Sequence, residues 1–326
     1  MVLCPADQIV QPVKLFLLFV QRLELRAAAE SEAAQQLLRR ACAAERLRPR
    51  NFLVSAARVL HARADVFPVV HSLEDELGKK LFLRHSFHIE LTEEGALLRD
   101  RAEDLVSMAD KIEQEFLSLG DLTGGELYFG LAESYQIRRL ARGLHTLKAL
   151  SPGLHYHITS GDTEQVTEKL DRGLLDFAVI CETPDARKYE SLPFPEGDRF
   201  GLLLPEGDPL AQKASIRAAD LAGLPLFASE QSLAKDIAPW AKERFHELRL
   251  EGSFRLAYNG SLFTMERLGY LLTLEHLVNT APGSGLVFRP LEPELKLSFY
   301  LIWNKYQTFT PIAERFLEIM RREFSS

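Results

Sequence analysis

Residues 73–98 read LEDELGKKLFLRHSFHIELTEEGALL, and the periodicity of this segment changes along its length. Its first five residues carry leucines at both ends, four positions apart, which places the two leucines on one face of a helix. Gly78 tolerates the backbone conformation in which helices commonly end. The segment 88–91 alternates as a half-buried strand does, and Thr92 then serves as the N-cap of a new helix with an acidic first turn. The predicted order is therefore helix, basic turn, short hairpin and helix.

Ten residues of this segment stand at the fixed positions of a known family pattern; they are Leu73, Glu74, Leu77, Gly78, Leu81, Phe82, Arg84, Leu91, Thr92 and Gly95. That pattern closes the DNA-binding domain of LysR-type transcriptional regulators, which the chain resembles here. The resemblance implies a winged helix-turn-helix in which the hairpin is the wing. It also implies DNA contacts from basic residues of this domain, which we expect from Arg58, Arg63, Lys79, Arg84 and His85.

The whole chain is acidic rather than basic. With 326 residues it is long enough for about two domains, and an apolar content of 46% supports cores of full size. Its net charge is −7, so binding to nucleic acid has to come from a local basic region. Positions 39–63 hold seven arginines and one glutamate, which fits either a surface that neutralises phosphates or a solvated helical face.

The cysteines and the apolar runs indicate the compartment. Cys4, Cys42 and Cys181 lie far apart, in a spacing that fits neither a metal site nor a disulfide framework. Such cysteine usage is typical of a reducing cytoplasm. The apolar run 15–20 is too short to cross a bilayer and marginal as the core of a signal peptide. We expect a soluble, cytoplasmic protein with no membrane partner.

The segment before Leu73 departs from the family pattern. A paired alanine followed by a leucine resembles the first helix of the motif, yet the Gln-Pro and Ser-Arg pairs that usually open the recognition helix are missing. Pro68 falls inside that helix, where a proline removes a donor and costs about 3 kcal/mol. Either the helix is rebuilt, with Arg63 and His71 as DNA contacts, or residues 1–72 are a partly out-of-frame translation of an ordinary regulator gene. The abrupt return of the pattern favours the second hypothesis, which the coding DNA would test.

A long linker helix is predicted over 92–120. Apolar residues recur there at alternating intervals of four and three; they are Leu98, Ala102, Leu105, Ala109, Ile112, Phe116 and Leu119. An apolar seam of period 3.5 specifies a left-handed pairing of helices. The seam could pack on its own domain, but its charged flanks and the family's use of this helix favour pairing between chains. We expect a homodimer or homotetramer held by Leu98, Leu105, Ile112 and Phe116.

The remainder alternates strands and helices, which predicts a largely parallel sheet with right-handed crossovers. Expected strands cover 126–132, 154–159, 175–180, 199–205, 224–228, 253–258, 286–290 and 297–304. Expected helices cover 137–150, 163–172, 232–248, 261–272 and the segment after Thr310. The family resemblance implies that these elements form two lobes, similar to those of type 2 periplasmic binding proteins.

The predicted fold is therefore mixed: an α-rich N-terminal winged helix-turn-helix, a long linker helix and a C-terminal α/β two-lobed domain. The expected boundaries are 1–91 for the DNA-binding domain, of which 1–55 is poorly defined, 92–120 for the linker helix and 121–326 for the effector domain. Lobe I is expected over 124–198 and 288–326, and lobe II over 199–287.

Polar side chains follow the predicted strands of both lobes. Ligands of open α/β sheets bind beyond the carboxyl ends of the strands, near helix N-termini. A single Ser, Thr or Asn there is equally well explained as a helix cap. As a set, these residues predict contacts to an inducer; they are Ser134, Tyr135, Gln136, Thr163, Ser229, Gln231, Asn259 and Ser261. Glu133 and Glu230 stand among them and weaken the case for a strongly anionic inducer.

The sequence carries no pattern of catalytic residues. His155 and His157 share a strand face without a visible partner, and Gly283-Ser284-Gly285 lacks the frame of a nucleophile elbow. We expect no enzyme, no cofactor and no metal. The first hypothesis is a LysR-type regulator that binds promoter DNA and a small-molecule inducer. The second is a small-molecule sensor whose N-terminus does not bind DNA, and the third is an enzyme, such as a dehydratase, on the same scaffold.

Overall fold

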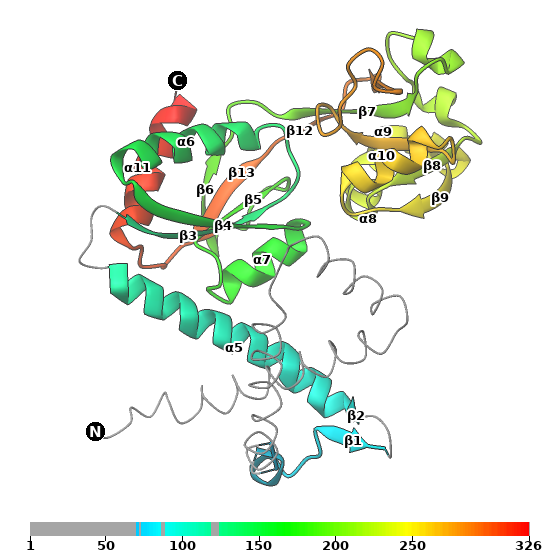
Figure 1. Ribbon diagram of the computed structural model, residues 1–326. Helices are drawn as coiled ribbons and strands as arrows, with labels where there is room; N and C mark the ends of the chain where they lie inside the picture. Colours follow the sequence, from blue (N-terminus) through cyan, green and yellow to red (C-terminus); the bar gives the residue numbers. More distant parts are fainter. Residues whose placement is uncertain (1–69, 72, 86–88, 119–123, 326) are drawn as a thin grey trace, which may run out of the picture. The chain divides into compact units, whose positions relative to one another are not determined.

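The computed structural model describes residues 70–71, 73–85, 89–118 and 124–325. The chain divides into two compact units, with the boundary between Glu113 and Gln114 (Figure 1). The segment in which the recognition helix and the seven-arginine patch were expected lies outside the described residues.

The described part of the first unit is a short hairpin followed by a long helix. Strand β1 (Phe82–Arg84) pairs antiparallel with β2 (Ile89–Leu91), and α5 (Glu93–Ser118) follows directly (Figure 1). Gly78 has a positive φ of 62°, a conformation that favours glycine, at the end of the preceding helical turn. The order of these elements is the one that the sequence predicts.

Side-chain and backbone contacts at the base of the hairpin explain why the motif needs its threonine and its second glycine. The Thr92 hydroxyl donates to the Lys80 carbonyl at 2.7 Å and accepts from the Gly95 N–H at 2.9 Å. A Cβ on Gly95 would lie 2.1 Å from the Leu81 carbonyl oxygen, so only glycine lets the helix approach the strand this closely. The buried Glu74 carboxylate accepts from the Leu81 N–H at 2.8 Å and thereby fixes the start of the hairpin.

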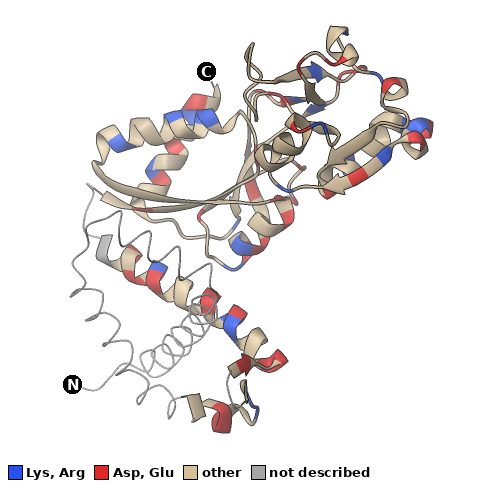
Figure 2. Cartoon of the chain, turned by 45° about the vertical axis from the view of Figure 1, so that its right-hand side comes forward, with Lys and Arg blue, Asp and Glu red and all other residues tan. Residues whose placement is uncertain are grey.

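The apolar seam of α5 lies in two different environments. Leu98 and Ala102 pack with the residues of the hairpin in one hydrophobic cluster. Three later residues of the seam stay exposed, by 40% for Leu105, 45% for Ile112 and 71% for Phe116. Charged side chains of both signs are interspersed along the helix (Figure 2). The described part of the chain thus buries the first half of the seam and leaves the second half uncovered.

Lobe I of the second unit is built on a five-stranded sheet. Its strands stand in the order β4 (Gly153–Ser160), β3 (Gly124–Leu131), β5 (Phe177–Ile180), β13 (Tyr300–Asn304) and β6 (Tyr189–Pro193). The first three strands run parallel, and β13 is antiparallel to both of its neighbours. Helices α6 (Ile137–Leu150) and α11 (Pro311–Ser325) pack together on one face, and α7 (Thr163–Asp171) packs on the other (Figure 1).

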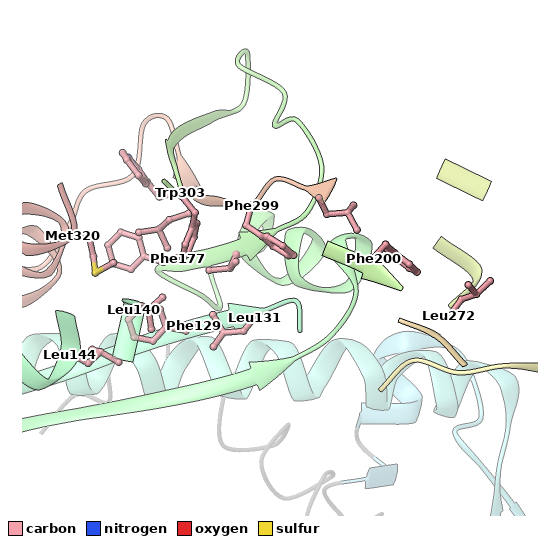
Figure 3. Close-up of a cluster of buried hydrophobic side chains, with 14 of the residues drawn as sticks. Phe129, Leu131, Leu140, Leu144, Phe177, Phe200, Leu272, Phe299, Trp303 and Met320 are labelled. Atoms are coloured by element: carbon pink, nitrogen blue, oxygen red, sulfur yellow. The ribbon is translucent and has the colours of Figure 1, made fainter. Parts of the chain in front are cut away.

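The core of lobe I follows from the alternation of side chains along its strands. In β5, Phe177 belongs to the cluster on the α6–α11 side, while its neighbour Ala178 packs with α7. The Phe177 ring lies 5.1 Å from that of Phe316 and 5.8 Å from that of Phe129 (Figure 3). Aromatic rings at these separations make favourable contacts beyond the burial of their area. This packing holds the carboxyl ends of the parallel strands in place.

Lobe II is built on a second sheet, with the strand order β11 (Leu286–Pro290), β7 (Asp198–Pro205), β10 (Tyr270–Leu274), β8 (Pro225–Ala228) and β9 (Arg249–Ser253). Its helical segments are η1 (Pro209–Gln212), η2 (Ala218–Leu221), α8 (Glu230–Ser232), η3 (Leu233–Ile237), α9 (Ala238–Ala241), η4 (Lys242–Glu247) and α10 (Ala257–Met265). The chain enters this lobe between β6 and β7 and leaves it between β11 and β13. On the return, β12 (Lys296–Leu297) pairs with the start of β7.

Two elements predicted for lobe II are wrong, and so is the expected return to lobe I at residue 288, because β11 pairs with β7 in the sheet of lobe II up to Pro290. The expected strand 253–258 is instead β9, which ends at Ser253, and α10 begins within the predicted strand at Ala257. All five residues of β9 are exposed, so its sequence shows no alternation that would mark a strand. The expected helix 261–272 ends at Met265, and β10 follows as a strand. A short apolar run such as Tyr270–Leu274 has the pattern of a buried helix as much as that of a buried strand.

Candidate functional site

A cavity of about 780 Å³ lies between the two lobes of the second unit, and we call it the interlobe cavity. From lobe I it is lined by residues that follow β3, β4 and β5, and from lobe II by residues that follow β8 and β9. These are the carboxyl ends of parallel strands, where ligands of α/β sheets bind. Strands of both lobes therefore position one shared site.

Gln231 joins the two lobes across the interlobe cavity. Its Nε2 donates to the Thr163 hydroxyl at 3.0 Å and to Glu182 Oε1 at 2.7 Å, and its Oε1 accepts from the Thr163 N–H at 3.3 Å. Lys235, one helical turn further on, forms an ion pair with the same Glu182 at 2.5 Å. Two side chains of lobe II thus hold two polar loop ends of lobe I.

Glu133 makes a second connection between the lobes. Its carboxylate follows β3 and accepts from the Ala257 N–H at 2.7 Å, at the first residue of α10. A carboxylate at this end of a helix is stabilised by the unpaired N–H groups and the helix dipole. Burial raises the pKa of Glu133, and the hydrogen bond from Ala257 opposes that shift. The N-terminus of α10 is therefore occupied by an anion that belongs to the chain itself.

Two further titratable side chains line the interlobe cavity. Burial raises the pKa of Asp236 to about 6; the Glu182 carboxylate adds to this shift and the Lys235 ammonium opposes it. Burial also raises the pKa of the Cys181 thiol, which lies 3.7 Å from the Thr163 hydroxyl. A thiol with a raised pKa is a poor nucleophile, because the thiolate is the reactive form.

Three of the eight residues predicted to contact an inducer line the interlobe cavity: Thr163, Ser229 and Gln231. Ser229 is also the N-cap of α8, because its side chain accepts from the Ser232 N–H at 3.1 Å. The capping role and the cavity-lining role therefore occur together in this residue.

Ser134, Tyr135 and Gln136 lie outside the lining of the interlobe cavity. All three bind the buried carboxylate of Asp198, the first residue of β7, through the Ser134 hydroxyl at 2.6 Å, the Tyr135 N–H at 2.8 Å and the Gln136 Nε2 at 3.0 Å. This loop of lobe I is thus tied to the strand that carries the chain into lobe II. Its hydrogen bonds to Asp198 therefore stabilise the connection between the lobes and not a ligand in the cavity.

Asn259 and Ser261 also lie outside the lining of the interlobe cavity. Both fall inside α10, because β9 ends earlier than the sequence predicts. Ser261 is buried, and its hydroxyl donates to the Tyr258 carbonyl at 2.7 Å.

Four residues that the sequence did not single out as contacts line the interlobe cavity: Cys181, Glu182, Lys235 and Asp236. The first two follow β5, a strand that was correctly predicted, so extending the rule of the carboxyl ends to this third strand would have found them. The other two lie in the helical segment after β8, and no local pattern distinguishes them from a solvated helical face.

The residues expected to contact DNA are only partly described. Lys79 is exposed, with its Nζ 3.4 Å from Glu94, and His85 lies 3.8 Å from Glu90. Arg84 is the last residue of β1. Arg58 and Arg63 lie outside the described residues.

The described residues also bear on metal sites and membrane spans. Among them, no three His, Cys, Asp or Glu side chains converge in a way that would hold a metal ion. None of the described helices is long and apolar enough to span a membrane.

Comparisons with known proteins agree with this architecture. The family model of the LysR substrate binding domain matches residues 120–325. A probable hydrogen peroxide-inducible genes activator of Mycobacterium avium is 29% identical over 182 residues, which are 56% of this chain and 58% of that relative. The DNA-binding transcriptional dual regulator OxyR of Escherichia coli K12 is 25% identical over 261 residues, 77% of this chain and 82% of that relative.

Among solved structures, that of CbnR, a LysR family transcriptional regulator, matches with a TM-score of 0.69 at 18% identity over 97% of this chain and 99% of that chain. Full-length CbnR in complex with its target DNA matches with a TM-score of 0.64 at 19% identity over 82% of this chain and 93% of that chain. Identities this low show a shared fold. The family model, in contrast, covers more than half of the chain, and it shows that the protein belongs to the LysR family of transcriptional regulators.

Proposed function

We propose that this LysR-type regulator binds promoter DNA through its N-terminal unit and changes its DNA binding when a small-molecule inducer occupies the interlobe cavity. Two or four copies act together, paired along α5. The observation that carries the proposal is the interlobe cavity itself, whose two walls belong to different lobes and are joined by contacts across the gap such as those of Gln231, Glu133 and Lys235.

The contacts across the interlobe cavity supply the coupling. Gln231 and Lys235 hold Glu182, while Glu133 holds the N-terminus of α10. A ligand that replaces some of these contacts changes the preferred arrangement of the lobes, because it binds one arrangement more tightly than the other. Coupling to DNA then needs only that the arrangement of the lobes alters the spacing of the DNA-binding units.

The β1–β2 hairpin supports the DNA-binding part of the proposal. The turn before β1 carries an exposed Lys79, and the base of the hairpin is fixed by Glu74 and Thr92. Basic residues at the hairpin of a winged helix-turn-helix are suited to contact phosphates. OxyR of Escherichia coli is named as DNA-binding, and CbnR has been solved with its target DNA.

The exposed half of the α5 seam supports pairing of copies. Leu105, Ile112 and Phe116 follow the spacing of a coiled-coil seam and are open to solvent in the described chain. A second α5 would bury these three side chains.

A mobility shift on the DNA directly upstream of the gene tests the proposal. Because bound phosphates release counterions, we expect an affinity that falls steeply with salt. Lys79→Ala should weaken binding on every sequence and lower the slope of log Kd against log salt by about one. Lys296→Ala removes an exposed cation of β12, on the other unit, and should change neither quantity. No shift even at low salt would refute the DNA-binding part.

A second candidate function is a small-molecule sensor that does not bind DNA. The observation that favours it is the missing Gln-Pro and Ser-Arg pairs before Leu73, together with Pro68 in the expected recognition helix. The same mobility shift decides between the two functions, because this candidate predicts no salt-dependent binding. Ligand binding in the interlobe cavity is expected in both cases.

A further inference from the structure

The polar wall of the interlobe cavity is strongly acidic. Six carboxylates line it: Glu133, Asp162, Glu164, Glu182, Glu230 and Asp236. Two cationic side chains, Lys235 and Arg255, face them. The lining therefore carries an excess of four negative charges when all of these groups are ionised. A confined space lined by one sign of charge concentrates ligands of the opposite sign.

The other wall of the interlobe cavity is apolar. Six of its residues come from the strands and crossings between the lobes and from lobe II; they are Phe200, Phe254, Leu272, Leu274, Leu297 and Phe299. Phe200, Leu272 and Phe299 are buried in the main hydrophobic cluster of the chain or at its edge (Figure 3). A ligand that fills this cavity thus meets both apolar surface and carboxylates.

Two of the groups that could receive an anionic ligand are already engaged, whereas the exposed Arg255 has no ion pair among the described residues. Lys235 pairs with Glu182, and the N-terminus of α10 donates the Ala257 N–H to the Glu133 carboxylate. Asp236, in contrast, has no hydrogen-bond partner among the residues that the structure describes, although it is half-buried beside Glu182. A ligand group that donates hydrogen bonds and carries positive charge would therefore supply the partner that Asp236 lacks.

We infer that the interlobe cavity takes an organic cation, an amine on an apolar body, whose ammonium group lies between Asp236 and Glu182 and whose body lies on Phe200 and Phe299. This inference rests on the proposed function and names the class of its inducer. A bare metal ion fits less well, because among the described residues no three carboxylates converge on one point. The volume of about 780 Å³ accommodates a ligand of small-molecule size.

Matched ligands test the inference on the full-length protein. The probes are tryptamine and hexylamine, each compared with its neutral alcohol, tryptophol and hexanol, and with a carboxylate of similar size, indole-3-acetate and hexanoate. Isothermal titration at pH 7.5 gives each Kd. We expect at least one amine to bind about tenfold more tightly than its alcohol, since a hydrogen bond to a charged partner is worth that much, and the carboxylates to bind most weakly.

Variants locate the binding. Asp236→Asn keeps the shape of the side chain and should weaken amine binding about tenfold while leaving the alcohol unchanged. Glu230→Gln, in the same lining, serves as a second variant should the first not fold, and its expected loss is smaller. Glu190→Gln on β6 removes an exposed carboxylate outside the interlobe cavity and should leave every Kd unchanged. Circular dichroism confirms that each variant is folded.

Three results would overturn the inference: no binding of any amine in the series, a carboxylate or alcohol that binds as tightly as its amine, or full amine affinity in both folded variants. Tight binding of a carboxylate that also changes the mobility shift would refute the cationic class and leave the proposed function intact. Amine binding without any effect on DNA would instead support the inference and refute the proposed regulation.

Discussion

Asp198→Asn tests how the loop after β3 is held to the strand that enters lobe II. The buried Asp198 carboxylate accepts hydrogen bonds from the Ser134 hydroxyl, the Tyr135 N–H and the Gln136 side chain, at 2.6, 2.8 and 3.0 Å. An asparagine has almost the same shape, but one of its two polar atoms is an NH₂ group. That group replaces an acceptor, so the loop keeps its hydrogen bonds only if the Gln136 side-chain amide turns over to accept from it, and the negative charge of the acceptor is lost in either case.

The magnitude follows from this count. A hydrogen bond to a charged group contributes about 1.5 to 3 kcal/mol and one between neutral groups about 0.5 to 1.5 kcal/mol, so each of the three bonds loses about 1 kcal/mol with the charge. The serine hydroxyl can turn to accept from the amide, which recovers part of the loss. We therefore expect a destabilisation of about 3 kcal/mol. For a folding unit of 150–250 residues this lowers the melting temperature by about 6 to 12 °C.

Thermal unfolding followed by circular dichroism measures this change on the full-length protein, with the transition of the second unit as the readout. Glu190→Gln is the matched control, because it makes the same chemical change on an exposed side chain of lobe I. A shift of less than 2 °C for Asp198→Asn, or an equal shift for the control, would refute the claim that this carboxylate holds the loop. Glu133 lines the interlobe cavity and directly precedes the loop 134–136. If the variant loosens this loop, it should therefore also weaken ligand binding in the cavity.

Three further outcomes follow from the same structure. Gly95→Ala should destabilise the first unit by about 2 kcal/mol, because the added Cβ would lie 2.1 Å from the Leu81 carbonyl oxygen; loss of DNA affinity together with an unchanged melting of the second unit would show it. Ile112→Glu should convert the oligomer to monomers in sedimentation velocity by placing a charge in the exposed seam, while Glu103→Gln should not, and an unchanged oligomer would contradict pairing along α5. Asp236→Asn should raise the melting temperature most at pH 7.5. The pKa of Asp236 in the folded state, about 6, lies above the ordinary value of 3.8. The wild-type protein therefore loses stability as pH rises from 3.8 to about 6, because ionisation of this side chain is less favourable in the folded state. The gain should be about 1 kcal/mol after allowance for solvent screening, smaller at pH 5 and absent below pH 3.8; a gain that is constant with pH would contradict the assignment.

The sequence by itself determined the elements whose signals are local. The motif from Leu73 to Gly95 predicted the hairpin and the helix after it, and the structure shows contacts that several of its positions require, such as the close approach at Gly95. Helix α6 has the bounds that its apolar spacing predicts, and β3, β4 and β5 of lobe I lie within a few residues of their expected ranges, whereas β6 was not predicted. These signals are local because caps, turns and periodicity act over a few residues.

Tertiary structure alone decided which polar residues share the interlobe cavity. Gln231 and Thr163 are 68 positions apart, and Glu133 and Ala257 are 124 positions apart. No local pattern records such pairings, because they depend on how two sheets are placed by the crossing strands. Burial decided the rest: the loop 134–136 turns its donors toward the Asp198 carboxylate, because a buried charge is costly unless it is hydrogen-bonded.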